Sequence, residues 1–323
     1  MNSSLYLTVI IVSYNTRQLT LKCLETLYEN TVSTKFRTVV FDNDSRDGTV
    51  EAILRDFPQV EVVAHQENIG FARANNLAAA SVRTDWILLL NPDTEVYEGA
   101  IDNLLEFSRN HPTAGITGGR TFFPDGSLNP LSCQGRITVW SSFCKATGLS
   151  MIFPSSALFN SEAYGGWRRD SVREVDIIVG CFLMVRRSLW VELEGFDLRY
   201  FMYGEDSDLS LRASKLGYRP AICPDAEIMH LVGASSKVKW RKQVMVAKSR
   251  TTLVHDHWNA SLVPIGVSLI WAWAATRTVW AYLTSTLRGG SGNDRLQYWT
   301  NIWQCRNDWL QPYRNQGTDD TSL

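Results

Sequence analysis

The sequence lacks an excess of charge of either sign and lacks any regular cysteine pattern. Its 323 residues include 32 Lys and Arg and 33 Asp and Glu, which gives a net charge of -1. A chain this neutral has no electrostatic reason to take nucleic acid as its main partner, and we expect none. The six cysteines are scattered, without a CxxC pair or zinc-like spacing. We therefore expect free thiols in a reducing compartment, and a cytoplasmic protein.

The N-terminus lacks the pattern of a signal peptide. The apolar run LYLTVIIV is short and is interrupted by Ser13, Tyr14 and Asn15, so we predict a buried strand there. The chain also lacks a GxGxxG motif after this first strand. That absence argues against a dinucleotide-binding oxidoreductase.

What the first hundred residues do contain is an alternation of β-rich runs with helix-like segments. Runs such as WILLL have no polar alternation, which is typical of parallel strands buried on both faces by helices. We predict an α/β fold: an open, mostly parallel, Rossmann-like sheet flanked by helices. Such sheets bind ligands at the carboxyl ends of their strands. Polar residues follow four of the predicted strands, at positions 13–15, 42–44, 66–68 and 91–93.

The middle of the chain is less regular. Pro124, Asp125 and Gly126 predict the turn of a hairpin. Residues 130–170 mix Ser, Gly, Arg and aromatics without a period, and we expect a flexible loop that contacts substrate. Order returns in REVDIIVGCFLMVRR, where we expect a strand pair bent at Gly180. These patterns predict one domain over residues 1–236 and a separate helical region over residues 237–323.

The C-terminal region is rich in tryptophan and contains the most apolar stretch of the chain. Eight of the twelve Trp residues lie at or beyond Trp240. From Ser261 only sixteen residues pass before Arg277, whereas a membrane span needs about 20. The aromatic side chains of this stretch are Trp271, Trp273, Trp280 and Tyr282. They favour a helix lying in a membrane interface; the alternatives are a helix packed on the first domain or on a second subunit of a homodimer, and a true span.

Three carboxylates crowd into the start of the helix-like stretch EDSDLSLRASKLGY. Glu205, Asp206 and Asp208 occupy three of four consecutive positions. Acids at a helix start cap free backbone N–H groups and suit the positive end of the helix dipole. A carboxylate in this place could equally accept a proton in catalysis, and the residues alone leave both interpretations open.

Seven motifs follow one another in the order and spacing of inverting family 2 glycosyltransferases. They are TVIIVSYNT, FDNDSRDGT, ENIGFARANN, LLLNPDTEV, VGCFLMVRR, GFDLRYFMYGEDSDLSLR and IMHLVGAS. The chain therefore resembles that family over roughly residues 5–235, most of all its bacterial rhamnosyltransferase-like branch. The resemblance implies a GT-A fold, a nucleotide-sugar donor, a divalent cation and a carboxylate base.

The resemblance assigns the first two strand ends to the nucleotide. Tyr14 and Asn15 would stack on and hydrogen-bond a pyrimidine. Asp42 and Asn43 would accept from the ring N–H of the base and from the ribose. The residues alone also allow a plainer interpretation, in which Asp42 and Asn43 start an Asx turn.

The motif NIGFARANN is expected to meet the donor diphosphate. Gly70 at a helix start would let backbone N–H groups approach the phosphates. Arg73 would add a cation one turn further in, unless it is a solvated surface charge.

The motif NPD raises the question of a metal. The family pattern is Asp-x-Asp, and here Asn91 replaces the first acid while Asp93 matches the acid that binds the cation. One Asp can suffice for Mg²⁺ when substrate phosphates complete the shell. The resemblance makes His230 a further ligand, and an imidazole ligand favours Mn²⁺ somewhat over Mg²⁺.

In the family the Asp of the Glu-Asp pair is the general base, which corresponds to Asp206. Glu205 would then lie in the acceptor site, and Asp208 would be the helix-cap acid, with the helix beginning near Ser207. Gly180 would leave room for the donor sugar or the acceptor.

The resemblance implies an enzyme of cell-surface polysaccharide synthesis, peripheral at the inner face of the cell membrane. It would move L-rhamnose from dTDP-rhamnose to a saccharide acceptor, which we expect to be lipid-linked. The alternatives are a transferase for a UDP-hexose or UDP-galactofuranose, and a non-catalytic scaffold that binds sugar nucleotides. The intact Asp93, Asp206 and His230 argue against a scaffold. Choice of the donor sugar is expected to depend on residues 120–170.

Overall fold

The computed structural model describes residues 6–231, 238–287 and 293–314. The chain forms two compact units, which we describe separately. Unit 1 comprises residues 1–135, 167–201 and 205–235, and unit 2 comprises residues 136–166, 202–204 and 236–323. The expected boundary at residues 236–237 lies outside the described residues. Residues 136–166, which we expected in the first domain, belong to the C-terminal unit.

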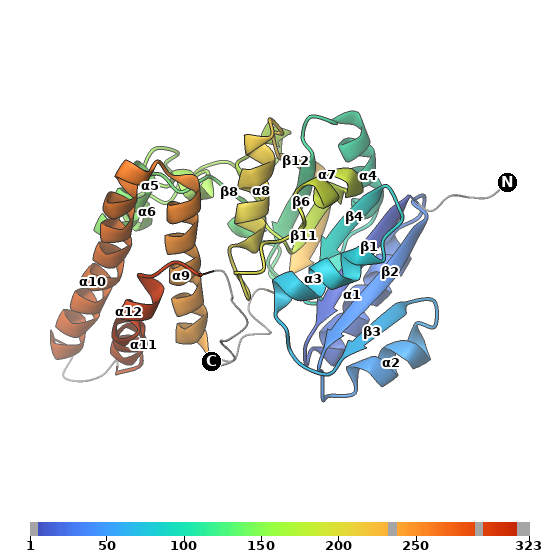
Figure 1. Ribbon diagram of the computed structural model, residues 1–323, viewed down its shortest axis with the longest axis horizontal. Helices are drawn as coiled ribbons and strands as arrows, with labels where there is room; N and C mark the ends of the chain where they lie inside the picture. Colours follow the sequence, from blue (N-terminus) through green and yellow to red (C-terminus); the bar gives the residue numbers. More distant parts are fainter. Residues whose placement is uncertain (1–5, 232–237, 288–292, 315–323) are drawn as a thin grey trace. The chain divides into compact units, whose positions relative to one another are not determined.

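Unit 1 is built on one ten-stranded sheet (Figure 1). Its strands are β1 (Leu7–Ser13), β2 (Phe36–Asn43), β3 (Glu61–His65), β4 (Trp86–Leu90), β5 (Thr94–Val96), β6 (Ile116–Phe122), β7 (Leu128–Asn129), β9 (Arg173–Glu174), β11 (Phe182–Arg186) and β12 (Ala221–His230). The order across the sheet is β3-β2-β1-β4-β11-β6-β12-β5, with β7 beside β6 and β9 beside β12. Strands β1 to β4 pair in parallel, as predicted. Strand β11 runs antiparallel between β4 and β6, so the complete sheet is mixed.

Helices flank this sheet. They are α1 (Arg17–Asn30), α2 (Thr49–Asp56), α3 (Phe71–Ala80), α4 (Ala100–Asn110), α7 (Arg187–Glu192) and α8 (Glu205–Lys215). Every residue of β4 is buried, and β1 is buried at all but one position. Continuous burial of this kind explains why the two strands read as unbroken apolar runs. Residues such as Val9, Ile11 and Leu88 form the core beneath the helices.

Two shorter predictions for the middle of unit 1 can be compared with the structure. Strands β6 and β7 pair antiparallel around the turn at Pro124, Asp125 and Gly126, which confirms the hairpin. The segment expected to be a strand pair bent at Gly180 instead forms three short pieces: β9, β10 (Ile177–Ile178) and β11. The middle piece leaves the main sheet and pairs with β8 (Cys133–Gln134), which follows the short helix η1 (Pro130–Ser132).

Unit 2 is helical. Its elements are α5 (Val139–Thr147), α6 (Leu149–Ile152), η2 (Ser161–Ala163), α9 (Lys239–His257), η3 (Ala260–Leu262), α10 (Val263–Leu287), α11 (Asn293–Gln304) and α12 (Arg306–Trp309). The expectation of a flexible loop over residues 130–170 was therefore wrong. A capping box between Thr138 and Ser141 starts α5. The core contains Val254, Ile270 and the fully buried Trp309.

A buried ion cluster joins residues 136–166 to α9. The Glu162 carboxylate accepts two hydrogen bonds from the Arg250 guanidinium, at 2.8 and 2.9 Å, and pairs with the Lys145 ammonium. Burial raises the pKa of Glu162, but the two cations lower it by more, so the carboxyl stays ionised. This cluster gives the irregular sequence a fixed place within unit 2.

Helix α10 is longer than the sequence count suggested. The helical stretch Ala260–Leu287 has 28 residues and is long and apolar enough to cross a membrane by length and composition alone. Arg277 lies inside this helix, and its guanidinium donates to the Ala146 carbonyl at 3.2 Å within unit 2. The interfacial helix over this stretch stays a prediction.

Candidate active site

Asp206 is the second residue of α8, because the helix begins at Glu205 rather than near Ser207. Its Oδ2 accepts a hydrogen bond from the Gly180 N–H at 2.9 Å, and its Oδ1 accepts one from the Ser207 N–H at 2.7 Å. Burial raises the pKa of Asp206, and these hydrogen bonds offset only part of that effect. The result is a fixed carboxylate that is more basic than an exposed aspartate.

Glu205 has a different environment although it is the adjacent residue. Its side chain is buried, and its Oε2 has no hydrogen-bond partner in the structure. Burial, with the neighbouring Asp206, raises the pKa of Glu205 well above its ordinary value. Two carboxyl groups with separated pKa values can take different roles. Here Asp206 is the one that ionises first.

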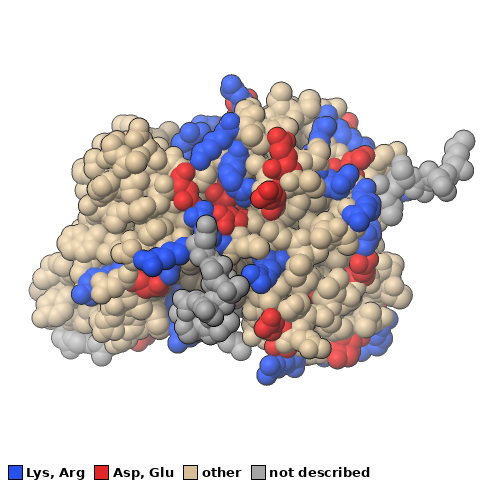
Figure 2. Space-filling view, viewed as in Figure 1, with Lys and Arg blue, Asp and Glu red and all other residues tan. Residues whose placement is uncertain are grey.

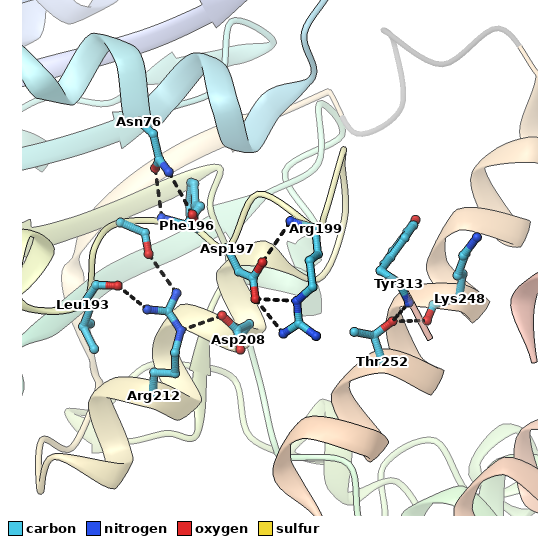
Figure 3. A network of polar contacts seen from close by, with 11 residues as sticks. Asn76, Leu193, Phe196, Asp197, Arg199, Asp208, Arg212, Lys248, Thr252 and Tyr313 are labelled. Atoms are coloured by element: carbon cyan, nitrogen blue, oxygen red, sulfur yellow. Dashed lines mark hydrogen bonds and ion pairs between the residues drawn. The ribbon is translucent and has the colours of Figure 1, made fainter. Parts of the chain in front are cut away.

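Asp208 was expected to be the helix-cap acid, but it lies in the fourth helical position. Its carboxylate pairs with the Arg212 side chain at 2.6 Å, one turn along α8. Arg212 also donates to the carbonyl oxygens of Leu193 and Gly195 (Figure 3). Asp208 therefore orients an arginine that fastens the chain segment preceding α8.

The same segment is held from its other side by α3. The Asn76 amide donates to the Phe196 carbonyl at 2.8 Å and accepts from the Phe196 N–H at 2.9 Å (Figure 3). Further along, the Phe71 N–H donates to the Phe201 carbonyl at 2.9 Å. Hydrogen bonds to the backbone thus fix residues 193–201 at both ends, and the segment ends five positions before Asp206.

Gly70 is required at its position by this packing. Its φ is +83°, and a Cβ there would lie 2.5 Å from the Phe201 carbonyl oxygen. Its N–H donates to Oδ1 of Asn68 at 3.0 Å. The structure thus gives a reason for glycine that differs from the expected approach of a diphosphate, and the diphosphate contact stays a prediction. Arg73 is exposed on the third position of α3.

Asp93 and His230 lie together where β5 pairs with β12. The His230 Nε2 is 3.2 Å from Oδ1 of Asp93, because Thr94 and His230 are register partners. Burial lowers the pKa of His230, but Cys181 and Asp93 raise it by more, to about 10. A cation would need the neutral imidazole, so it would have to displace this proton.

The residues around this pair fit a divalent cation that is shared with a substrate. Asn91, in the same turn, has a buried side-chain oxygen without a hydrogen-bond partner. Among the described residues there is no group of three or more His, Cys, Asp or Glu able to hold a metal alone. A site with one carboxylate, one imidazole and one amide oxygen suits an ion completed by phosphate and water. The motif IMHLVGAS continues from His230 into residues 232–235, which lie outside the described residues.

Gly180 and Cys181 connect the carboxylate base to this pair. The Gly180 N–H holds Asp206, and the carbonyl of the next residue, Cys181, accepts from the Asn91 N–H at 3.0 Å. The Cys181 side chain is also one of the groups that raise the pKa of His230. A Cβ added to Gly180 would lie 3.7 Å from Oδ2 of Asp206, which is ordinary contact. Cys181 was not predicted as a site residue, although its place beside Gly180 in the motif VGCFLMVRR could have indicated it.

Tyr14 and Asn15 follow β1 as predicted. Tyr14 is 44% exposed, so its ring is free to stack on a base. Asn15 has a left-handed backbone with φ of +51° and links two strand ends. Its N–H donates to the Ser45 hydroxyl, and its Oδ1 accepts from the Arg46 N–H, both at 2.8 Å. Asn15 thus shapes the loop, and its contact with a nucleotide stays a prediction.

Asp42 and Asn43 are the last two residues of β2. One of them has an atom free for a ligand, and the other shapes the neighbouring loop. The Ser45 N–H donates to Oδ1 of Asp42 at 2.9 Å, which is the turn interaction of the plainer interpretation. The Oδ2 of Asp42 is buried without a partner, which leaves it available to a ligand. Asn43 donates to Asn68 and accepts from the Ile69 N–H, so its amide organises the segment before α3.

The sequence of this chain matches a known protein family. The family described as "Glycosyl transferase family 2" matches residues 8–176. An N-acetylglucosaminyl-diphospho-decaprenol L-rhamnosyltransferase of Mycobacterium tuberculosis is 32% identical over 207 residues, 58% of this chain and 64% of the relative. Rhamnosyltransferase WbbL of Escherichia coli is 29% identical over 235 residues, 69% of this chain and 82% of the relative. The chain thus matches less than two thirds of the mycobacterial protein's length.

Solved structures show the same fold. A mannosyltransferase, PcManGT from Pyrobaculum calidifontis, in complex with GDP-Man and Mn²⁺, aligns with a TM-score of 0.56 and 20% identity over 94% of this chain and 84% of that one. GalNAc-T7 with UDP, GalNAc and Mn²⁺ aligns with a TM-score of 0.54 and 13% identity over 82% of this chain and 55% of that one. At these identities the likeness shows the fold alone, and it confirms the predicted GT-A fold.

Proposed function

Because the chain belongs to glycosyl transferase family 2, we propose that it is an inverting glycosyltransferase that moves L-rhamnose from dTDP-rhamnose. The acceptor would be a lipid-linked saccharide of cell-surface polysaccharide synthesis. The choice of rhamnose is supported by relatives that are named as rhamnosyltransferases. The choice of acceptor is supported by the diphospho-decaprenol in the mycobacterial relative's name.

The observation that carries the proposal is a short chain of contacts. Asp206 is held by the Gly180 N–H, the adjacent Cys181 carbonyl binds the Asn91 N–H, and Asn91 precedes Asp93, which lies against His230. In one displacement, an acceptor hydroxyl oxygen would bond to the anomeric carbon while its proton passes to the Asp206 carboxylate. The bond from that carbon to the diphosphate oxygen would break, and the nucleoside diphosphate would leave with the electron pair. Attack opposite the leaving group inverts the sugar, as in inverting glycoside hydrolysis.

A divalent cation, Mg²⁺ or Mn²⁺, would be held by Asp93, His230 and the free amide oxygen of Asn91. When bound, it would neutralise charge on the leaving diphosphate. Support comes from the orphaned Asn91 oxygen and from two structural neighbours that contain Mn²⁺. On the donor side, the Tyr14 ring and the free Oδ2 of Asp42 are positioned for a base and a ribose.

We further propose that the enzyme works at the inner face of the cell membrane, which its α10 helix contacts. A lipid-linked acceptor keeps its sugar close to the bilayer, and an interfacial helix would keep the active site there. The aromatic residues Trp271, Trp280 and Tyr282 of α10 are at least 46% exposed, which supports this contact.

A donor screen tests the proposed function. Nucleotide release would be measured with dTDP-rhamnose, UDP-galactofuranose, UDP-glucose and GDP-mannose, with manganese and a lipid-linked saccharide acceptor. We expect acceptor-dependent release from dTDP-rhamnose above the other three donors. Faster nucleotide release from a UDP-sugar would show that the assignment of rhamnose is wrong. If none of the four donors releases its nucleotide, the result would support a non-catalytic scaffold.

A further inference from the structure

The short helix α6 and the residue after it carry apolar side chains that are largely exposed among the described residues. Met151 and Ile152 are 67% and 65% exposed, and the next residue, Phe153, is 46% exposed. Nearby on α5, Trp140 and Phe143 are also exposed. Single exposed apolar residues are common and need no explanation. A contiguous group of exposed apolar residues marks an interaction site.

Helix α10 lies directly against this segment. The Thr276 hydroxyl donates to the Ala146 carbonyl at 2.9 Å, and the Arg277 guanidinium lies 3.5 Å from the Met151 sulfur. The residues of α10 that follow are apolar and exposed. They are Val279 at 57%, Trp280 at 58% and Leu283 at 48%. Met151, Ile152, Phe153, Val279, Trp280 and Leu283 are together called the α6–α10 surface.

The charge of unit 2 identifies what this surface would meet. The described residues of unit 2 include eleven Lys or Arg and four Asp or Glu, although the whole chain is balanced. Figure 2 shows that, on the face drawn, the part of the molecule over α10 is mostly uncharged. An apolar, tryptophan-containing area within a basic unit is complementary to a bilayer with anionic headgroups. A second copy of the chain would bring the same excess of positive charge and is disfavoured.

We propose that the α6–α10 surface docks onto an anionic bilayer, so that residues 136–166 form a second membrane contact beside α10. The inference extends the membrane contact proposed for α10 and rests on that part of the proposed function. It adds a role for the segment between α5 and η2. Ion pairs of Glu162 with Lys145 and Arg250 hold this segment on α9, so the two contacts would enter the bilayer as one rigid piece.

Three matched substitutions test this proposal in the full chain. Each replaces an exposed aliphatic residue by Glu: Ile152→Glu on α6, Val279→Glu on α10, and Leu54→Glu on α2 of unit 1, which is 56% exposed. Sedimentation with vesicles of phosphatidylglycerol and phosphatidylcholine in equal parts would measure binding. We expect Ile152→Glu and Val279→Glu each to lower the partition coefficient about tenfold, and Leu54→Glu to leave it unchanged. Vesicles of phosphatidylcholine alone should bind the unchanged chain more weakly.

The outcomes separate this inference from the function it rests on. If Val279→Glu loses binding and Ile152→Glu does not, the second contact is wrong and the contact by α10 stands. If neither substitution weakens binding, both are wrong. Equal binding to neutral and anionic vesicles would overturn the charge argument. Sedimentation velocity without lipid would reveal a change of oligomeric state in Ile152→Glu, which would make the surface a contact between copies instead.

Discussion

Asp206 and Glu205 are adjacent on one helical turn, but Asp206 accepts hydrogen bonds from the Gly180 and Ser207 N–H groups, whereas Oε2 of Glu205 is buried without a partner. A general base works only when it is ionised, so activity should fall as pH falls through its pKa. Because burial raises this pKa above 3.8, the acid limb of kcat should have its midpoint above that value. The measurement is kcat against pH at saturating donor and acceptor. Full activity maintained down to pH 3.8 would be inconsistent with Asp206 as the base.

The cation site makes a prediction at single residues as well. Asp93→Ala should abolish metal-dependent turnover, because it removes the only carboxylate of the proposed ligand set. His230→Ala should raise the metal concentration needed for half-maximal activity and spare more of the maximal rate. Titration of Mn²⁺ into metal-free enzyme measures both effects. Undiminished activity in excess chelator would contradict the metal assignment.

The role of a single residue could be predicted where a sequence motif determines its chemistry. It could not be predicted where contacts with distant parts of the chain determine the role. Tyr14 lies exposed after β1 as expected. The glycine at position 70 is explained by a carbonyl 131 residues further along the chain, at Phe201. No local pattern could reveal that contact. Cys181 likewise joins two parts of the site only because β11 lies beside β4.

At the scale of elements, the ion pair within α8 should support both folding and the reaction. Asp208→Ala leaves Arg212 with its two carbonyl partners but without its carboxylate, in a place where Asp208 is 3% exposed. We expect a loss of about 2–3 kcal/mol in the free energy of unfolding. If Asp208 were only a helix cap, the same substitution would lower the free energy of unfolding by about 1 kcal/mol or less. Denaturant unfolding separates these two values.

The matching effect on catalysis distinguishes positioning from stability alone. Residues 193–201 lead into α8, so Asp208→Ala should lower kcat for transfer while donor binding changes little. Ser214→Ala, later on α8, serves as the control. Both rates are measured under conditions far below the unfolding midpoint. If Asp208→Ala destabilises the protein but its kcat equals that of Ser214→Ala, the Asp208–Arg212 ion pair is purely structural.

The ion cluster of unit 2 should hold α5 in place. Glu162→Gln would leave Lys145 and Arg250 without their shared carboxylate, and we expect unit 2 to lose about 3–5 kcal/mol. Glu25→Gln is the surface control, since the Lys22–Glu25 pair is exposed and solvent screens it, so its loss should leave protection unchanged. Hydrogen exchange of the α5 amides is the measurement. Unchanged protection in Glu162→Gln would contradict the role of the cluster.

Elements were predictable where their apolar period is strong. Strands β1, β2 and β4 were expected from their continuous apolar runs, because burial on both faces produces such runs. Helix α5 was missed because the sequence between residues 130 and 170 has no such period. Its stability comes from Glu162, Arg250 and the Ala146 carbonyl, whose partners lie far along the chain.

For the whole molecule, the near-zero net charge conceals an uneven distribution between the units. Unit 2 is basic and exposes aromatic side chains, whereas the overall balance suggested only an ordinary globular protein. The sequence could not assign residues 136–166 to this unit, since they are separated from α9 by the rest of unit 1. Their assignment changes a suspected substrate loop into a candidate contact with the membrane.

The central claim is that Asp206 accepts the proton of the acceptor hydroxyl during sugar transfer. Asp206→Asn keeps the shape of the side chain and one of its two accepted backbone hydrogen bonds, and it removes the basicity. The measurement is transfer to acceptor at saturating donor, paired with calorimetric donor binding on the same variant. The account predicts that turnover falls about 10²–10⁴-fold, with donor affinity nearly unchanged. Near-normal transfer by Asp206→Asn, or loss of transfer only together with donor binding, would contradict it.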